Sequence, residues 1–511
     1  MAASLTKVLV ANRGEIAVRI IRGCHEMGLK AVAVYSDCDR TAQHVRQADE
    51  AYAIGANPPR DSYLRIDKII DVARASGADA VHPGYGFLAE NAEFARGCRD
   101  AGLIFIGPTP ETIALMGSKT AARAVAIAAG VPVVPGTKDA LGPDVPEAEV
   151  ARIAAEVGYP ILIKAVSGGG GKGMRTVTEA AGLASALRAA RSEALSAFGD
   201  PAVYIERLVV RPRHIEIQLL GDQYGTVVPF VERECSIQRR HQKVVEESPS
   251  LQVSSATRGK LAAAAAAIAR GVGYTNAGTI EFLLDQSGEF FFLEMNTRLQ
   301  VEHPVTELVT LTDLVHWQLR IAGGERLDID PELALTPHGH AIECRIYAED
   351  PDGDFLPSPG RVTACAVPAG PGIRRDDSGA VAGADIPVYY DPLIAKLSAW
   401  AADRPMAIAR MRRALDEYDV RGIKTTIPFF RWLLADPDFQ AGRFDTSFID
   451  LALASRNGRP FQQTPPEDEP LVIVAAAVHA MNQPTRTADR SSAPAAQESR
   501  WRRHARDQGQ R

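Results

Sequence analysis

Two glutamates in neighbouring apolar segments are the most informative pair of residues in this sequence. Glu281 and Glu294 each lie in a short run rich in Phe, Leu and Ile, and a Ser-Gly turn signal separates the runs. A hairpin closed at that turn pairs Glu281 with Glu294 and Leu283 with Phe292, with Cβ atoms about 5 Å apart. Facing carboxylates are destabilising unless a cation lies between them. Asn296 would add an oxygen on the same face, which favours Mg²⁺ or Mn²⁺ bridged to phosphates; the alternative is an exposed acidic hairpin face.

Polar residues continue at every second position beyond that hairpin. Arg298, Gln300 and Glu302 follow Asn296 with this spacing, and a strand or extended loop would point them all the same way. The row predicts a metal-and-anion site that ends in a carboxylate. Glu302 could act as a general base if its charged surroundings tune its pKa suitably, and the alternative is an ion pair with Arg298.

A glycine-rich loop, SGGGGKG at Ser167–Gly173, follows an apolar strand predicted over 161–165. Glycine has no Cβ, so the backbone N–H groups of such a loop can approach phosphate oxygens closely. The motif is not a P-loop, because no Ser or Thr follows Lys172. We expect a phosphate-covering loop between this strand, which carries Lys164, and a following helix. The alternative is a flexible linker.

A third charged segment spans residues 232–247. Its Arg239, Arg240, His241 and Lys243 would suit ATP or a small oxyanion, although the segment taken alone is more typical of a solvated charged face. Cys235 has no evident base and is expected to pack rather than to attack a substrate. By spacing alone, His214 and His303 are expected to be structural.

The elements that must position these residues alternate at first between strand and helix. We expect strands at 7–11, 30–35, 78–82 and 104–106, and helices at 15–27 and 69–75. This order implies a parallel sheet. The first turn, Asn12–Glu15, lacks the GxGxxG fingerprint, so a dinucleotide is not expected.

The C-terminal part reads as β-rich and then irregular. We expect strands at 340–346, 361–367 and 393–400, then a helix at 405–418. Residues 471–481 could form a short apolar strand or helix. Residues 482–511 are rich in Pro, Ser, Ala and Arg, as is typical of disorder in isolation.

Composition narrows the class of protein. The 511 residues are 46% hydrophobic and 23% charged, which is ordinary for a globular chain of about three domains. A net charge of −6 without a long basic tract makes nucleic acid a poor partner. Six cysteines without a CxxC pair exclude a disulfide scaffold and a standard zinc site. No signal peptide is evident, and the longest apolar run, 261–269, is far short of the ~20 residues of a membrane span; we expect a cytoplasmic protein without a membrane partner.

Beyond these patterns, the sequence closely resembles one family: the biotin carboxylase subunits of acetyl-CoA and related acyl-CoA carboxylases, in the ATP-grasp superfamily. The matching stretches run in order from about residue 5 to residue 450: ANRGEIAVRI, HPGYGFLAEN, MGSK, GGGGKGM, RHIEIQ, ECSIQRRHQKVVEE, GTIEF, EMNTRLQVEHPVTE, ECRIYAEDP and FLPSPG. Pyruvate and propionyl-CoA carboxylases share these motifs, which therefore leave the final acceptor open.

The resemblance implies an α/β fold, α+β overall, in three domains. These would be a Rossmann-like domain with a parallel sheet at 1–118, an ATP-grasp domain at 119–330 with a mobile glycine-rich lid at about 135–205, and a β-rich domain at 336–450. Residues 462–511 would be a flexible extension. There, Trp501 among arginines suggests a helix that docks on a partner, and a solubilising tail is the alternative.

The same resemblance implies the reaction. Bicarbonate attacks the γ-phosphate of MgATP to give carboxyphosphate and ADP, and carboxyphosphate yields CO₂, which carboxylates N1 of biotin. No lysine lies in a Met-Lys-Met setting, so biotin is expected on a separate biotin carboxyl carrier protein, and the carboxyltransferase subunit would be a further partner. A homodimer is also expected, although Pro371 stands where some relatives carry an aromatic residue at the dimer contact.

The resemblance finally implies roles for individual residues. Catalysis would fall to Glu302 as the base for bicarbonate, Arg298 assisting, Arg345 stabilising the biotin enolate, and Lys243, which surrounds bicarbonate with Gln300 and Val301. Nucleotide binding would fall to Lys119, Lys164 and His214, the lid glycines Gly168, Gly169, Gly170 and Gly171, Glu206 and Leu208 at adenine, and Gln238 and His241 near the ribose. Two Mg²⁺ or Mn²⁺ ions would be held by Glu281 and Glu294, with Asn296 close by.

Three alternatives stay open at this point. The chain could be the biotin carboxylase component of a pyruvate carboxylase. Another ATP-grasp enzyme, such as a carboxylate–amine ligase or a carbamoyl-phosphate-type synthetase, would share the hairpin and the lid but would not need Arg345. A non-catalytic nucleotide-binding scaffold is the non-enzyme alternative, and the presence of every expected acid and base argues against it.

Overall fold

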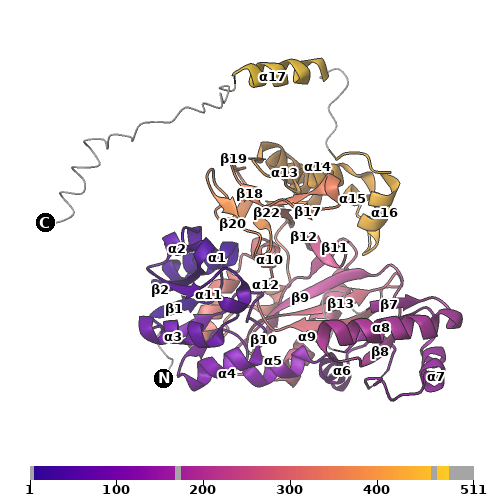
Figure 1. Cartoon of the computed structure of the whole chain (residues 1–511). Helices are drawn as coiled ribbons and strands as arrows, with labels where there is room; N and C mark the ends of the chain where they lie inside the picture. The colour runs from indigo at the N-terminus through magenta and orange to yellow at the C-terminus, as the bar shows by residue number, and fades with distance from the viewer. Residues whose placement is uncertain (1–4, 138, 167–173, 462–468, 483–511) are drawn as a thin grey trace, which may run out of the picture. The chain divides into compact units, whose positions relative to one another are not determined.

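The computed structural model describes residues 5–137, 139–166, 174–461 and 469–482 (Figure 1). The chain divides into two compact units, Met1–Phe461 and Gln462–Arg511, and each is described by itself. The first unit holds a parallel sheet, a small antiparallel sheet and a large antiparallel sheet.

A five-stranded parallel sheet forms the N-terminal part, in the order β3-β2-β1-β4-β5. Its strands are β1 (Lys7–Val10), β2 (Lys30–Ser36), β3 (Glu50–Gly55), β4 (Ala80–His82) and β5 (Ile104–Phe105); its helices are α1 (Gly14–Glu26), α2 (Gln43–Gln47), α3 (Ile66–Ser76), α4 (Ala92–Asp100) and α5 (Pro110–Gly117). The parallel sheet predicted from the alternation is confirmed. Sequence patterning misses β3, because Glu50 and Tyr52 interrupt its apolar run.

A three-stranded antiparallel sheet carries the glycine-rich loop. Its order is β7-β6-β8, from β6 (Ile161–Ala165), β7 (Met174–Val177) and β8 (Val203–Arg207), and it packs against α7 (Glu147–Val157) and α8 (Leu183–Phe198). The first element after the loop is a strand, because β-branched Thr176 and Val177 pair with β6, and the expected following helix, α8, comes after that strand. The loop residues Gly168–Gly171 and Lys172 lie outside the described residues.

A nine-stranded antiparallel sheet forms the rest of the first unit. Its path is β14-β13-β9-β11-β12-β15-β22-β20, with β10 on β9. The strands are β9 (Arg213–Gly221), β10 (Val227–Pro229), β11 (Arg233–Arg239), β12 (Gln242–Ser248), β13 (Asn276–Leu284), β14 (Phe290–Asn296), β15 (His340–Tyr347), β20 (Ile373–Asp377) and β22 (Leu393–Ala401). Because β12 pairs with β15, the parts expected as separate domains before and after residue 330 share one sheet.

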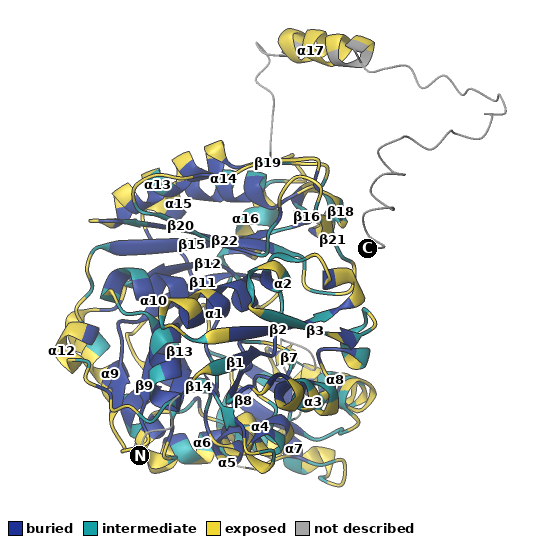
Figure 2. Cartoon of the chain, turned by 90° about the vertical axis from the view of Figure 1, so that its left-hand side faces the viewer, coloured by how far each residue is buried: buried dark blue, intermediate teal, exposed yellow. Residues whose placement is uncertain are grey.

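Helices pack against this sheet through apolar faces. α9 (Ser255–Gly271) begins at Ser254, whose side chain accepts a hydrogen bond from the Thr257 N–H, and its buried Leu261, Ala265 and Ile268 recur at helical spacing. The other helices are α6 (Lys119–Ala128), α10 (His303–Thr310), α11 (Leu314–Ala322), α12 (Pro331–Ala334), α13 (Arg404–Glu417), α14 (Ile427–Ala435), α15 (Pro437–Gln440) and α16 (Phe448–Ser455). Buried residues follow the strands, and the exposed ones gather on outer helix faces and loops (Figure 2).

The segment 361–367, predicted as one strand, is divided between two small sheets. β18 (Gly360–Arg361) pairs with β21 (Asp385–Ile386), and β19 (Ala364–Ala366) pairs with β23 (Asp419–Arg421). The division falls where the Val362 N–H donates to Ala384 and the next N–H, from Thr363, donates to Arg421. A further pair joins β16 (Glu349–Asp350) to β17 (Leu356–Pro357).

The second unit contains helix α17 (Glu469–Asn482). The apolar segment 471–481, for which the sequence left both strand and helix open, is therefore helical. Leu471 and Ile473 on this helix are exposed. Within the described ranges, no helix is long and apolar enough to cross a membrane. The prediction around Trp501 falls outside the described residues.

Candidate active site

The hairpin of β13 and β14 places Glu281 directly opposite Glu294, as the sequence predicts. Beyond this pair the predicted register is wrong, because β14 carries a bulge next to Glu294 that shifts the partners by one residue. Leu283 therefore lies opposite Phe291 rather than Phe292. A bulge bends one strand and re-aims nearby side chains, and this one adjoins the paired carboxylates.

Glu281 is surrounded by hydrogen-bond donors. Its Oε1 accepts from Lys243 Nζ at 2.8 Å, from Asn296 Nδ2 at 2.9 Å and from Gln300 Nε2 at 2.9 Å. His214 Nε2 lies 3.0 Å from its Oε2. Burial raises the pKa of Glu281, but the charges of Lys243 and His214 outweigh burial and hold the pKa well below its usual range.

The pKa of the opposing Glu294 is shifted in the other direction. Burial raises its pKa, and the negative charge of Glu281 raises it further, against a lowering by Lys119. A cation between the two carboxylates would remove this repulsion, so their oxygens fit Mg²⁺ or Mn²⁺. Asn296 fits less directly, because its Oδ1 already accepts a hydrogen bond from Arg298 Nη2 at 3.0 Å.

Lys243, near the start of β12, joins three carboxylates. Its Nζ donates to Glu216 Oε2 at 2.5 Å, to Glu302 Oε1 at 2.6 Å and to Glu281 Oε1 at 2.8 Å. Burial lowers the pKa of this ammonium, but the carboxylates outweigh burial and raise the pKa well above its usual range. Lys243 therefore keeps its charge at neutral pH and links the hairpin pair to Glu302.

Glu302 lies between two cations. Its Oε1 accepts from Lys243, and its Oε2 accepts from Arg345 Nη2 at 2.9 Å. Burial raises the pKa of Glu302, but these two charges outweigh burial and hold the pKa far below its usual range. That direction is opposite to the tuning of a base poised near neutral pH. The alternative ion pair with Arg298 is wrong, because Arg298 pairs with Glu90 at 2.9 Å.

The segment 297–302 is irregular, because β14 ends before it and α10 begins after it. Of the two possibilities that the spacing leaves open, the segment is a loop rather than a strand, and its polar side chains converge on one site. Neighbouring strands fix the segment: Arg233 Nη2 on β11 donates to Gln300 Oε1 at 2.7 Å. Lys396 Nζ on β22 donates to the Val301 carbonyl at 2.9 Å.

Several charged residues that complete the site are missed by the sequence analysis: Glu216, Arg233, Glu246 and Lys396. Arg233 is fully buried and also donates to Glu216 and Thr306. A solvated charged face is thus wrong for this arginine. Glu216 lies two residues after His214 and so shares its face of β9, and Arg233 and Glu246 fall in the charged segment 232–247.

The predicted phosphate-binding lysines lie near one another. Lys164 Nζ on β6 donates to Glu206 Oε2 on β8 at 2.6 Å, and Arg123 Nη1 donates to Glu206 Oε1 at 3.4 Å. Burial lowers the pKa of Lys119; the charge of Glu294 opposes this shift, and the charge of Lys164 adds to it. The structure therefore brings Lys119, Lys164 and Glu206 together beside the hairpin.

The remaining predicted nucleotide residues lie at strand ends and turns. Leu208 directly follows β8, and Gln238 on β11 donates through Nε2 to the Cys235 carbonyl at 2.9 Å. Arg240 and His241 form the two-residue turn between β11 and β12, with φ values of 51° and 65°. Non-glycine residues adopt this left-handed region at a cost, which marks the turn as a strained, candidate functional element.

The histidines and the cysteine divide into two groups. The structural role expected of His214 from its spacing stays a prediction; its Nε2 lies beside Glu281 at the hairpin. His303 is fully buried, with Nδ1 2.8 Å from the Gln300 carbonyl, and burial holds its pKa well below the usual range. Cys235 is also fully buried, and burial raises the pKa of its thiol, which agrees with a packing role.

A cavity of about 480 Å³ adjoins Arg345, with a volume suited to a small organic ligand. It is lined by the start of α1, the loop after β4, the segment 297–302 and the loop before β22, through residues that include Glu15, Tyr85, Arg298, Val301 and Tyr390.

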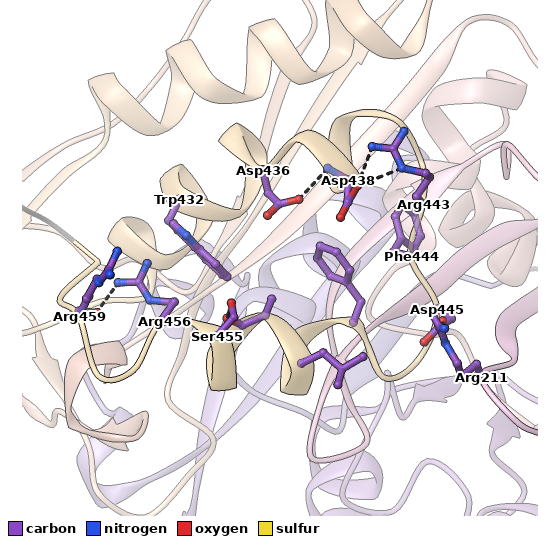
Figure 3. A pocket seen from close by; sticks show the side chains of 13 residues that line it. Arg211, Trp432, Asp436, Asp438, Arg443, Phe444, Asp445, Ser455, Arg456 and Arg459 are labelled. Atoms are coloured by element: carbon purple, nitrogen blue, oxygen red, sulfur yellow. Dashed lines mark hydrogen bonds and ion pairs between the residues drawn. The ribbon is translucent and has the colours of Figure 1, made fainter.

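Another cavity, of about 490 Å³, is lined by residues of α14, α15 and α16 (Figure 3). Two of its four arginines form ion pairs: Arg211 with Asp445 at 2.8 Å and Arg443 with Asp438 at 2.6 Å. None of the predicted site residues lines it, so the chemistry belongs to the hairpin and its neighbours.

Three family models match the chain in succession. “Biotin carboxylase, N-terminal domain” matches residues 4–113, “Carbamoyl-phosphate synthase L chain, ATP binding domain” matches 118–330, and “Biotin carboxylase C-terminal domain” matches 343–451.

Named relatives cover most of the chain. A biotin carboxylase of Nostoc sp. is 52% identical over 87% of this chain and 98% of its own length. A pyruvate carboxylase subunit of Methanothermobacter thermautotrophicus is 51% identical over 87% of this chain and 89% of its own. The alpha subunit of the mitochondrial methylcrotonoyl-CoA carboxylase of Dictyostelium discoideum is 48% identical over 92% of this chain, which spans only 66% of that protein.

Two solved structures also match most of the chain. The biotin carboxylase domain dimer of Hydrogenobacter thermophilus 2-oxoglutarate carboxylase, in complex with MgADP, ADP and bicarbonate, matches with a TM-score of 0.85 and 47% identity over 90% of this chain and 99% of that one. A biotin carboxylase–ATP complex from Campylobacter jejuni matches with a TM-score of 0.84 and 45% identity over 88% and 99%.

Proposed function

The chain belongs to the biotin carboxylase family and is an ATP-dependent biotin carboxylase, and we propose that it supplies the first half-reaction of an acetyl-CoA or related acyl-CoA carboxylase. Membership of this family excludes the non-catalytic scaffold and the other ATP-grasp ligases that the sequence left open. The relatives are named for several carboxylases and the shared motifs leave the final acceptor open, so an acyl-CoA is proposed as the first candidate and pyruvate as the second.

The contact of Glu302 with both Lys243 and Arg345 carries the proposal, because it joins an anion site to the cavity beside Arg345. We assign bicarbonate to Lys243, Arg298, Gln300 and Val301, and biotin to the cavity. MgATP would bind through Lys119, Lys164, His214, the glycines Gly168–Gly171, Glu206, Leu208, Gln238 and His241. Mg²⁺ held by Glu281 and Glu294, with Asn296 nearby, would neutralise phosphate charge during transfer.

The proton step follows from these contacts. Bicarbonate entering the cationic site competes with Glu302 for Lys243 and Arg345, which weakens the two contacts that hold the pKa of Glu302 low. Glu302 then accepts the bicarbonate proton, a bicarbonate oxygen bonds to the γ-phosphorus, and the bond to the β-phosphate oxygen breaks to release ADP. The C–O bond of carboxyphosphate then breaks to give CO₂ and phosphate, and the phosphate takes the N1 proton of biotin. N1 bonds to the carbon of CO₂, while Arg345 stabilises the negative charge on the ureido oxygen.

The assembly is also part of the proposal. We propose that a biotin carboxyl carrier domain presents biotin to the cavity, that a carboxyltransferase receives the product, and that the chain dimerises. Support for dimerisation comes from the relative described as a domain dimer. We also propose that the domains of the chain span residues 1–118, 119–330 and 336–450.

ADP release by the purified chain with MgATP and bicarbonate, with and without free biotin, tests the function. We expect biotin to stimulate turnover in the native chain and Glu302→Gln to abolish that turnover. Glu332→Gln, a change to an exposed acid on α12, serves as the matched control.

Native turnover that ignores both free biotin and a biotinylated carrier domain would contradict the proposed reaction. Adding the carrier with acetyl-CoA or pyruvate transferases, and measuring labelled bicarbonate in each product, then separates the two acceptors.

A further inference from the structure

Two buried glutamates behind Arg345 take no part in the reaction as described so far. Glu246 on β12 and Glu343 on β15 are direct partners in the antiparallel pairing, and both side chains are fully buried. Opposed residues in such a pair have Cβ atoms about 5 Å apart. Two ionised carboxylates in that position would repel each other strongly, because little solvent screens them.

Only one carboxylate oxygen of each of these two described glutamates accepts a hydrogen bond. Glu246 Oε1 accepts from Arg345 Nε at 2.6 Å, and Glu343 Oε2 accepts from Ser398 Oγ at 2.8 Å. In the part of the chain that the structure describes, Glu246 Oε2 and Glu343 Oε1 are buried without a hydrogen-bond partner. A proton on one of these oxygens would make it a donor to the other and satisfy both.

The electrostatic surroundings also favour a protonated carboxyl in this pair. Burial raises the pKa of Glu246 to about 7, against a lowering by Arg345, and the charge of Glu302 adds to the rise. Burial also raises the pKa of Glu343 well above its usual range, against a lowering by Lys396. Other titratable groups that interact with the pair are Lys243 on β12, Glu302 before α10, Cys235 on β11, and Cys344 and Tyr347 on β15. Asp376 on β20 and His303 on α10 interact with Lys396.

We propose that Glu246 and Glu343 hold one shared proton and together act as the positioning unit for Arg345. This inference rests on the proposed role of Arg345 at biotin. Oε1 of the ionised Glu246 lies 2.6 Å from Nε and 2.5 Å from Nη2 of Arg345, and this anchor fixes the guanidinium where Nη2 also reaches Glu302 Oε2 at 2.9 Å. The proton on Glu343 prevents a second negative charge from drawing Arg345 into the sheet. Loss of that proton at alkaline pH would then lower activity.

Single substitutions distinguish the role of Glu343 from that of Glu246. Glu343→Gln imitates the protonated carboxyl, so we expect kcat/KM for biotin at pH 7 to stay within about threefold of the native value. The decline of kcat/KM on the alkaline side should move to higher pH. Glu246→Gln removes the anchor of Arg345, and we expect a loss of about 100-fold.

The matched control is Glu247→Gln, the next residue on β12, whose carboxylate is held by Arg404 at 2.6 Å and by His340 at 3.1 Å. We expect it to lower thermal stability without moving the alkaline decline. A folded Glu343→Gln variant that loses more than about tenfold at pH 7, or that keeps the native alkaline decline, would overturn the shared proton.

Infrared difference spectroscopy gives a readout that does not depend on turnover. The native chain should show a protonated-carboxyl band that titrates on the alkaline side and is missing in Glu343→Gln. If the band persists in the variant, the inference is overturned, even where the native chain carboxylates biotin. If the band is lost, the inference is supported, even where biotin-dependent turnover is not observed. If Glu343→Gln does not fold, Glu343→Met, which is uncharged and of similar length, is measured in the same way.

Discussion

Lys243 places one positive charge among three buried carboxylates, so its removal should affect stability as well as activity. We expect Lys243→Gln to abolish ADP release and to lower the free energy of unfolding at pH 7 by about 3 to 5 kcal/mol, because it leaves buried charges unpaired. Glu302, whose pKa is held low by this lysine, contributes stability that is present above pH 4.5 and lost below it. The difference between the native chain and the variant should therefore shrink as the pH falls below 4.5.

Urea denaturation at pH 7 and pH 4 measures this difference, and Lys424→Gln supplies the control. Lys424 forms an exposed pair with Asp350 at 2.5 Å, so its loss should cost less than about 1 kcal/mol at either pH. Equal costs for the two lysine variants at pH 7 would contradict the role given to Lys243.

His44 is fully buried, and burial lowers its pKa from 6.5 to about 4. The unfolded chain binds this proton below pH 6.5 while the native chain does not, so native stability falls as the pH drops from 6.5 towards 4. The full effect of this residue is about 3 kcal/mol. His44→Gln should flatten the dependence of unfolding free energy on pH between 7 and 4; parallel native and variant curves would show that His44 does not set it.

The turn between β11 and β12 joins two paired strands through Arg240 and His241, both in the left-handed region. Asn-Gly is the favoured sequence for such a two-residue turn. Replacing the pair with Asn-Gly should stabilise the fold by about 1 to 2 kcal/mol and weaken ADP binding, because the proposed ribose contact of His241 is lost. Calorimetry and ADP titration test both effects, and Arg240→Gly alone, which relieves strain but keeps His241, separates them. A lower melting temperature in the double variant would contradict the strain argument.

Local elements could be predicted from the sequence, and long-range pairings could not. The Glu281–Glu294 hairpin was predictable because both strands and their turn lie within one short segment. The pairing of Glu246 with Glu343 joins residues far apart in the chain, so no local pattern announces it. Arg233 shows the same limit, because its charged segment is typical of a solvated face until the sheet closes around it.

At the scale of the whole first unit, the nine-stranded sheet ties the central strands to the C-terminal ones through β12 and β15. Calorimetry should accordingly show these two parts melting in one transition, because neither can unfold without breaking the shared sheet. Ligand-free scans of residues 1–461 provide the test, with MgADP as a stabilising control. Two resolved transitions, one of them shifted by MgADP, would show that the parts unfold independently.

The same β12–β15 contact bears on how the chain can be shortened. A fragment that stops before His340 would keep the glycine-rich loop and the β13–β14 hairpin but would uncover the edge of β12 over Val245–Ser248, where β15 pairs with it. Its open N–H and C=O groups would then offer a template to other strands. Such a fragment should associate edge to edge with its own copies and precipitate, so an excised nucleotide-binding half needs β15, or a substitute strand, to remain dispersed.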